Sequence, residues 1–193
     1  MSKASLIMTH GLPGSGKSTW AEEQVKKDAR NRVRVNRDDI REMLFGAEYH
    51  SSPPRKANEA QVSSVQKELI KKALLEGKTV YCDDNNLNAH TVKDLYALAK
   101  DHKATVDHKY FNVPIEECQR RNEQRGAAGG RYVPKDVIYR MASNSYSPDG
   151  QIKEFIVGSN GMVFGVARET PGGRIFDSFN DDGDHLYPTK SKG

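Results

Sequence analysis

The segment that most constrains the fold of this chain is GLPGSGKSTW, at residues 11–20. It satisfies the pattern G-x-x-x-x-G-K-[ST] in full, and it follows a short apolar run, SLIMTH. Glycines at these positions let the backbone turn so that successive N–H groups point at one anion. A strand, a glycine-rich loop and a helix in this order predict a phosphate-binding loop in an α/β fold.

This loop also predicts which residues bind a nucleotide. Lys17 is expected to bridge the β- and γ-phosphates, which makes it a catalytic residue as well, and the Ser18 hydroxyl is expected to bind Mg²⁺. The positive end of the helix that begins near Ser18 adds to the attraction for the anion. The predicted cofactors are ATP and Mg²⁺, and the predicted nucleotide-binding set is Gly14, Ser15, Gly16, Lys17, Ser18 and Thr19.

Apolar strands alternate with amphipathic helices four times along the chain, which predicts parallel strands joined by right-handed crossovers. The strands are expected at residues 5–10, at 32–36, in KTVYCDD and in ATVDHKYFNV. A long helix is expected from Asn58 to Gly77, with its apolar face formed by Val62, Val65, Leu69, Ala73 and Leu74. The fold class predicted is α/β, a P-loop kinase fold with a four-stranded parallel sheet between helices.

Two domains are expected. Residues 1–150 would form the P-loop domain, with an arginine-bearing lid at about 119–133. Residues 151–193 contain three apolar runs separated by the turn signals GSNG and ETPGG, which predict a small antiparallel β-meander. A flexible tail is expected from about Asp181. The meander is expected to cover an exposed edge or face of the sheet; seating of nucleic acid and self-association as a homo-oligomer are the alternatives.

The composition sets limits on compartment and partners. The formal net charge of +4 permits a polyanionic partner without requiring one. With only two cysteines, Cys82 and Cys118, a disulfide framework is not expected, and a reducing compartment is the default. The N-terminal apolar run is too short for a signal peptide, and no stretch approaches the length of a membrane span. We therefore expect a cytoplasmic protein with no membrane partner.

The segment VNRDDIREM follows the second expected strand, at the sheet edge where ligands of such folds bind. A kinase needs a carboxylate that orients the attacking hydroxyl and accepts its proton, and Asp38 and Asp39 are the candidates. Arg41 lies three residues after Asp38, hence on the same helical face, where it could bind a phosphate of the acceptor. The alternative is an aspartate N-cap followed by a surface arginine.

The segment YCDDNNLN ends the third expected strand. The side chains of Asp83 and Asp84 are expected to point to opposite faces, because the two residues are adjacent. One of them would reach the metal or its water, and the other would cap the next helix.

A third group of charged residues surrounds a glycine-rich hinge: Arg120, Arg121, Arg125 and Arg131. An arginine-bearing flap of this kind can close over a triphosphate and neutralise the charge that develops during transfer. Arg121 and Arg125 are four residues apart and share a helical face, whereas Arg120 is expected to point elsewhere. A solvated basic helix face is the alternative.

Together these segments resemble the 5′-hydroxyl polynucleotide kinase family. The resemblance is carried by GLPGSGKSTWAEE, VNRDDIREM, DDNNLN, HKYFNVPIEECQRRNEQRG and YVPKDVIYRM, over about residues 5–146. It implies Asp38 as the general base, Arg41 on the phosphate 3′ to the reacting hydroxyl, and Asp84 near the active centre. It also implies Arg121 and Arg125 as lid residues on the donor phosphates, with Arg125 catalytic.

One feature of the family's phage enzyme is missing. FDSFNDDGD resembles the DxDGT motif of its phosphatase domain only in composition, so no phosphatase is expected. The expected enzyme is a phosphotransferase that passes the γ-phosphate of ATP to the 5′-hydroxyl end of DNA or RNA, as in nucleic acid repair. The alternatives are a phage-type kinase of a hydroxymethylated DNA base, a small-molecule kinase of a nucleoside or sugar, and a nucleotide-gated binding module.

Overall fold

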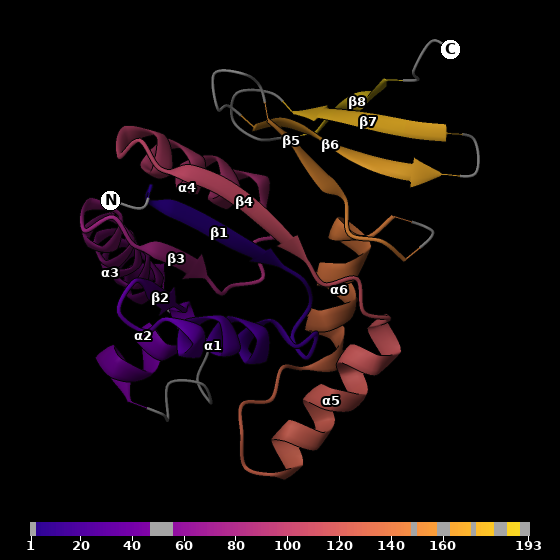
Figure 1. The fold of residues 1–193 in the computed structure, drawn as a ribbon. Helices are drawn as coiled ribbons and strands as arrows, with labels where there is room; N and C mark the ends of the chain where they lie inside the picture. Colours follow the sequence, from indigo (N-terminus) through magenta and orange to yellow (C-terminus); the bar gives the residue numbers. More distant parts are fainter. Residues whose placement is uncertain are drawn as a thin grey trace. The chain divides into compact units, whose positions relative to one another are not determined.

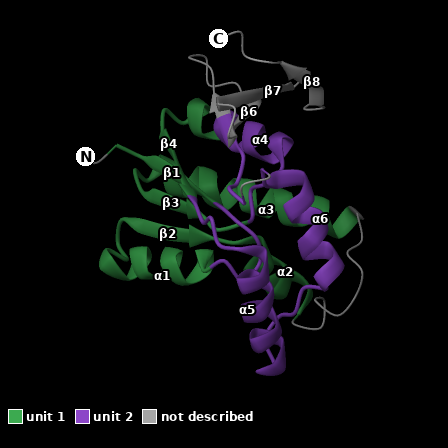
Figure 2. Cartoon of the chain, turned by 90° about the vertical axis from the view of Figure 1, so that its right-hand side faces the viewer, with its two compact units in different colours: residues 1–9, 16–84, 98–109 green, residues 10–15, 85–97, 110–193 purple. Residues whose placement is uncertain are grey.

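The computed structural model describes residues 3–46, 56–147, 150–157, 163–170, 173–179 and 185–189. The described residues divide into two compact units (Figure 2). The first comprises Met1–Thr9, Gly16–Asp84 and Leu98–Lys109, and the second comprises His10–Ser15, Asn85–Ala97 and Tyr110–Gly193. No helix among the described residues has the length and apolar character needed to cross a bilayer.

The elements of the chain alternate as the sequence predicts (Figure 1). In chain order the first eight are β1 (Ser5–His10), α1 (Lys17–Lys27), β2 (Arg32–Val35), α2 (Arg37–Phe45), α3 (Lys56–Leu75), β3 (Thr79–Cys82), α4 (Ala89–Asp101) and β4 (Thr105–Tyr110). They are followed by α5 (Ile115–Ala127), α6 (Lys135–Ser145), β5 (Glu154–Val157), β6 (Val163–Thr170), β7 (Gly173–Phe179) and β8 (His185–Thr189).

Strands β1 to β4 form a four-stranded sheet in the order β2-β3-β1-β4, which confirms the predicted parallel sheet. Strand β3 is central and pairs in parallel with both β1 and β2, with Val80 opposite Leu6 on one side and Val33 on the other. Leu6 and Val80 are fully buried. The carboxyl ends of β2 and β3 are thereby neighbours, so residues that are far apart in sequence meet there.

The buried face of α3 is rotated from the one predicted. Leu69 is 44% exposed, and the buried residues of this helix are Val62, Gln66, Ile70, Ala73 and Leu74. On a helix of 3.6 residues per turn these positions form one stripe, with Leu69 at its border. The prediction was wrong at Leu69 because it placed a polar residue, Gln66, outside the core.

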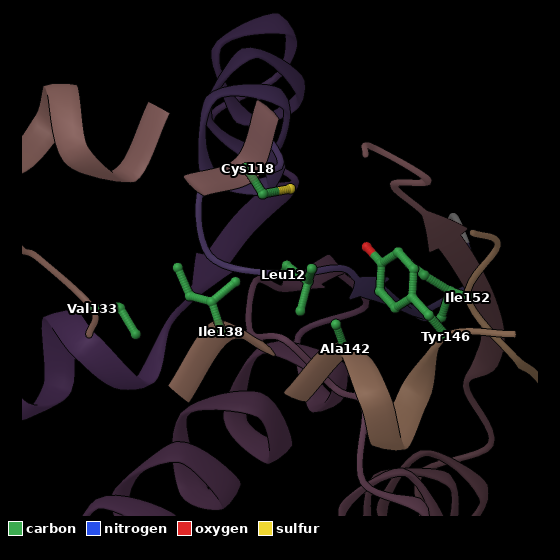
Figure 3. Close-up of a cluster of buried hydrophobic side chains, with 7 residues drawn as sticks. All are labelled: Leu12, Cys118, Val133, Ile138, Ala142, Tyr146 and Ile152. Atoms are coloured by element: carbon green, nitrogen blue, oxygen red, sulfur yellow. The ribbon is translucent and has the colours of Figure 1, made fainter. Parts of the chain in front are cut away.

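The second unit has its own hydrophobic core (Figure 3). It is built from buried residues of the phosphate loop, α5, the segment between α5 and α6, α6 and the segment after α6: Leu12, Cys118, Val133, Ile138, Ala142, Tyr146 and Ile152. His10, at the base of the loop, is also fully buried. Its ring stacks on Tyr110 with centroids 4.6 Å apart, and its Nδ1 donates to the carbonyl of Asn86 at 2.7 Å.

The C-terminal segment forms an antiparallel sheet in the order β5-β6-β7-β8, which confirms the predicted β extension. The two predicted turns fall largely outside the described residues, at 158–162 and 171–172. A flexible tail was expected from about Asp181, and within it residues His185–Thr189 form β8 and pair with β7. The rest of the expected tail lies outside the described residues. The short run HLYPT was overlooked as a strand because it is brief and contains a proline, which an edge strand tolerates.

Candidate active site

The phosphate loop joins β1 to α1, and two of its glycines have left-handed backbone conformations. Gly14 has a φ of 85°, and Gly16, the N-cap of α1, has a φ of 93°. Side chains rarely adopt such angles, so the loop needs glycine at both positions. Lys17 begins the helix and is buried, whereas Ser18 is exposed. This is the strand–loop–helix arrangement that the sequence predicts for an anion site at a helix N-terminus.

Gly14 has a second role, in packing. A Cβ atom at this position would lie 2.2 Å from the carbonyl oxygen of Cys118 in the first turns of α5. The loop and the backbone of α5 therefore approach each other more closely than any side chain would allow. Cys118 itself is fully buried in the core of the second unit.

The structure distinguishes the two aspartates that follow β3. Asp83 is 1% exposed, and the guanidinium Nε of Arg34 donates to its Oδ2 at 2.6 Å. Burial raises the pKa of Asp83, while the bond from Arg34, a bond from the Ser18 hydroxyl and the charge of Lys17 all lower it. Of the two aspartates, Asp83 is therefore the one on which both phosphate-loop residues, Lys17 and Ser18, act.

One oxygen of Asp83 is suited to bind a cation. Its Oδ1 is buried and has no hydrogen-bond partner among the described residues. Buried polar atoms without partners are rare in folded proteins. A serine hydroxyl of the phosphate loop and a nearby aspartate are the protein ligands that Mg²⁺ takes in P-loop enzymes. The residues present thus fit Mg²⁺.

Asp84 is engaged by protein groups through both oxygens. Its Oδ1 accepts from the backbone N–H of Arg37 at 3.0 Å, and its Oδ2 accepts from the amide of Gln66. Asp84 thus caps the start of α2, which precedes it in the chain. The expectation that one aspartate caps the next helix was wrong: the side chain of Asn88 caps α4, by accepting from the N–H groups of His90 and Thr91.

Asp38 and Asp39 lie in the first turn of α2. Their backbone N–H groups donate to the side chain of Asn36, at 2.8 Å and 3.2 Å, so the N-cap is Asn36 and not an aspartate. This leaves both carboxylates for other contacts. Asp38 pairs with Arg41 one turn further on, at 2.5 Å, as their spacing predicts. Asp39 pairs with Arg34.

Arg41 is held by a second carboxylate, that of Glu59 on α3. Its Nε and Nη2 donate to the two oxygens of Glu59 at 2.8 Å and 2.7 Å, and Arg37 donates to the same carboxylate at 2.9 Å. The bond from Arg41 is the main cause that lowers the pKa of Glu59 to about 2. Sequence reasoning missed both Glu59 and Gln66, because their only signal was a polar residue on an amphipathic helix.

The arginines of the expected lid lie in the second unit, on α5 and after it. Arg120 and Arg121 both pair with Glu117, at 2.7 Å and 2.6 Å, so the expectation that Arg120 points elsewhere was wrong. Arg125 instead turns toward the loop that follows α5. Its Nε donates to the carbonyl of Arg131 at 2.7 Å, and its Nη2 donates to Asn122 at 3.1 Å.

Comparison with known families matches residues 6–148 to the family model described as AAA domain. Among curated relatives, a protein of Autographa californica nuclear polyhedrosis virus named as a bifunctional polynucleotide kinase/RNA ligase is 31% identical over 64% of this chain. An L-seryl-tRNA(Sec) kinase of Methanococcus maripaludis is 30% identical over 74% of this chain. The chain spans 18% and 53% of the length of these two relatives.

Solved structures give a consistent result. A chain in the structure of the Pnkp1/Rnl/Hen1 RNA repair complex matches 75% of this chain with a TM-score of 0.65 and 28% identity, over 44% of its own length. A kinase structure from Chloroflexus aurantiacus matches 72% of this chain with a TM-score of 0.59 and 16% identity, which bears on the fold alone. These similarities confirm the resemblance to polynucleotide kinases that the motifs indicate. With the family model covering residues 6–148, the chain belongs to the AAA domain family.

Proposed function

We propose that this chain is an ATP-dependent polynucleotide kinase that transfers the γ-phosphate to the 5′-hydroxyl end of DNA or RNA. The observation that carries the proposal is the pair formed by Asp38 and Arg41 on α2, next to the carboxyl end of β2. It places a carboxylate and a guanidinium together in the same unit as Lys17 and Ser18. A protein that only binds nucleotide has no need for such a base. The relative from the baculovirus and the chain in the RNA repair complex support a polynucleotide as the acceptor.

In the proposed reaction the oxygen of the acceptor hydroxyl attacks the γ-phosphorus of ATP. The bond from that phosphorus to the bridging oxygen of the β-phosphate breaks, and ADP leaves. The proton of the hydroxyl passes to the Asp38 carboxylate. The ion pair with Arg41 favours the ionised form of Asp38 that a base requires.

Arg41 is proposed to bind the phosphate on the 3′ side of the reacting hydroxyl. Its Nε and Nη2 already hold a carboxylate in a bidentate arrangement, which is the geometry that suits a phosphate as well. Binding of the acceptor would therefore exchange at least one contact between Arg41 and Glu59 for a contact with the substrate. Asp84 would act through α2, because it caps the helix that carries both residues.

The donor side is proposed to be held by the phosphate loop, with Gly14, Ser15, Gly16 and Thr19 binding the phosphates alongside Lys17. Ser18 and Asp83 would hold Mg²⁺, which neutralises charge on the donor phosphates when bound. Arg121 and Arg125 are proposed to contact the same phosphates from the lid. For Arg121 this requires exchange of Glu117, a half-buried partner, for the nucleotide.

The domain division is part of the proposal. Residues 1–150 would carry the kinase activity, with the lid at about 119–133. The sheet of residues 151–193 would contribute to stability or to seating of the nucleic acid. An assembly of several copies of the chain is compatible with either role.

The test is a transfer assay with γ-labelled ATP and a panel of acceptors: 5′-hydroxyl DNA, 5′-hydroxyl RNA, hydroxymethylated duplex DNA and free nucleosides. A 5′-phosphorylated oligonucleotide of the same sequence is the matched control. We expect label only on the 5′ ends of the unphosphorylated strands, from which a phosphatase removes it. Label on internal bases or on free nucleosides alone would contradict the proposal.

A second candidate follows from the relative in Methanococcus maripaludis, which is named for a seryl-tRNA substrate. Its acceptor is a hydroxyl carried by an RNA, so the same base and phosphate loop would serve. Adding serine-charged tRNA to the panel separates the two candidates. Label on the seryl group, released together with serine by mild alkali, would favour this second function.

A further inference from the structure

The two oxygens of the Asp83 carboxylate have different surroundings. Oδ2 receives a hydrogen bond from Nε of Arg34 at 2.6 Å and one from the side-chain amide of Asn36 at 3.3 Å. Oδ1 is buried and has no hydrogen-bond partner among the described residues. Both side-chain hydrogen bonds end on Oδ2, and together they hold the carboxylate in one orientation.

The position and the contacts of Arg34 allow it to fix the orientation of the Asp83 carboxylate. It lies on β2, in register with Tyr81 of β3, so its side chain extends beside the strand that leads into Asp83. While Nε holds Asp83, Nη1 of the same guanidinium pairs with Asp39 in the first turn of α2. A planar guanidinium held at two points cannot rotate freely, which a lysine at this position would not reproduce.

A second cation acts on the same carboxylate. The charge of Lys17 and the hydroxyl of Ser18 both lower the pKa of Asp83, against the effect of its burial. Without Arg34, the carboxylate would be free to turn toward the ammonium of Lys17. That movement would withdraw the carboxylate oxygen from a cation.

We propose that Arg34 is a positioning residue for Asp83: together with Asn36 it holds one carboxylate oxygen and leaves the other, buried oxygen for a divalent cation. The inference rests on the proposed function in one respect, that the phosphate loop binds a nucleoside phosphate with Mg²⁺. Groups that orient a metal ligand in this way commonly contribute about 10–100-fold to metal affinity.

The test compares Arg34→Met with Arg32→Met in the full chain. Arg32 is the matched control, since it lies on the same strand and its guanidinium donates to the carbonyl of Gln24, in α1. The measurement is the affinity for a fluorescent ADP analogue, once with Mg²⁺ and once with EDTA, and the affinity for Mn²⁺ by electron paramagnetic resonance. For Arg34→Met we expect the increase in ADP-analogue affinity that Mg²⁺ causes to fall about 10–100-fold, and the affinity for Mn²⁺ to fall by a similar factor. The affinity for the ADP analogue in EDTA should stay unchanged.

Failure of the positioning role of Arg34 and failure of the proposed function would give different results. An equal loss in Mg²⁺ and in EDTA would overturn the inference, because it would indicate general damage to the loop. Unchanged or tighter metal binding would also overturn it, since Arg34 would then act only as a repelling charge. If the wild-type chain does not bind the analogue in either condition, the proposed function fails and the inference fails with it.

Removal of a charge that faces a buried carboxylate could prevent folding of Arg34→Met. Arg34→Lys keeps the charge and serves as the second variant. A single ammonium does not reproduce the two-point contact with Asp83 and Asp39. We therefore expect Mg²⁺ to increase the ADP-analogue affinity less than in the wild type. If Mg²⁺ increases the ADP-analogue affinity of a folded Arg34→Lys protein as much as that of the wild type, the proposal is overturned.

Discussion

Asn122 on α5 binds both backbone groups of Val133, eleven positions later in the chain. Its Nδ2 donates to the Val133 carbonyl at 2.8 Å, and its Oδ1 accepts from the Val133 N–H at 3.0 Å. Both residues are buried. One side-chain amide thereby closes the loop of the expected lid onto α5, in the way a strand partner would.

The first prediction concerns this contact. Asn122→Ala leaves a buried N–H and a buried carbonyl without partners, so we expect the free energy of unfolding to fall by about 2–4 kcal/mol. Urea denaturation gives the loss, and hydrogen exchange at the Val133 amide should accelerate. Gln124→Ala, at an exposed position of the same helix, is the control. Equal exchange rates at Val133 in both variants would contradict the prediction.

The second prediction separates backbone strain from steric clash. Gly14 and Gly129 have similar positive φ angles, of 85° and 79°, but a Cβ at Gly14 would meet Cys118 whereas one at Gly129 meets nothing within 4 Å. Gly129→Ala should lower the free energy of unfolding by about 1 kcal/mol. Gly14→Ala should lower it by about 3 kcal/mol or more, because the loop or α5 has to move. Denaturation without nucleotide measures both, and equal losses would refute the packing role of Gly14.

The third prediction concerns acid stability. Glu59 has a folded-state pKa of about 2, below its value in the unfolded chain, because Arg41 and Arg37 bind it. Its contribution is therefore complete above the unfolded-state pKa of roughly 4.3 and is lost as the pH falls toward 2. After allowance for solvent screening we expect this contribution to be about 1 kcal/mol.

The measurement is the free energy of unfolding at pH 6 and at pH 3. Glu59→Gln should narrow the difference between the two values relative to the wild type. Glu22→Gln, at an exposed position of α1, should leave it unchanged. A wild-type pH dependence in Glu59→Gln would mean that the pairs with Arg41 and Arg37 do not persist in solution.

The fourth prediction concerns the donor. Lys17→Ala removes the charge proposed to lie on the β- and γ-phosphates, so kcat/KM should fall by about 100-fold or more. Lys26→Ala, in the last turn of the same helix, serves as the control. Near-normal transfer by a folded Lys17→Ala protein would remove the phosphate loop from the proposed mechanism.

The fifth prediction concerns the base. Asp38→Asn keeps an acceptor oxygen for Arg41 but cannot accept a proton, so kcat should fall by about 100-fold or more with oligonucleotide binding retained. Asp39→Asn is the comparison, since Asp39 is 60% exposed and pairs with Arg34. If Asp39→Asn is the more damaging change, the roles of the two aspartates are reversed.

The amino-acid sequence by itself determined the elements and their order. The phosphate loop, the parallel strands and the pairing of Asp38 with Arg41 all follow from residues within a few positions of one another. Such signals are local, because they depend on backbone conformation, helical spacing and the alternation of apolar residues. The antiparallel C-terminal sheet was predicted on the same basis, from its turn residues, although β8 was not.

Only the tertiary structure decided how the charged residues share their partners. From the sequence alone, Asp83 and Asp84 are equivalent neighbours. In the folded chain Asp83 accepts a hydrogen bond from Arg34, and Asp84 accepts hydrogen bonds from the first residue of α2 and from Gln66. These contacts join residues 18 to 49 positions apart. Those with Arg34 and Arg37 form because β2 and β3 end side by side, and the one with Gln66 forms because α3 packs against β3. A local pattern carries no information about which distant donor will face a carboxylate, since that depends on the packing of whole elements.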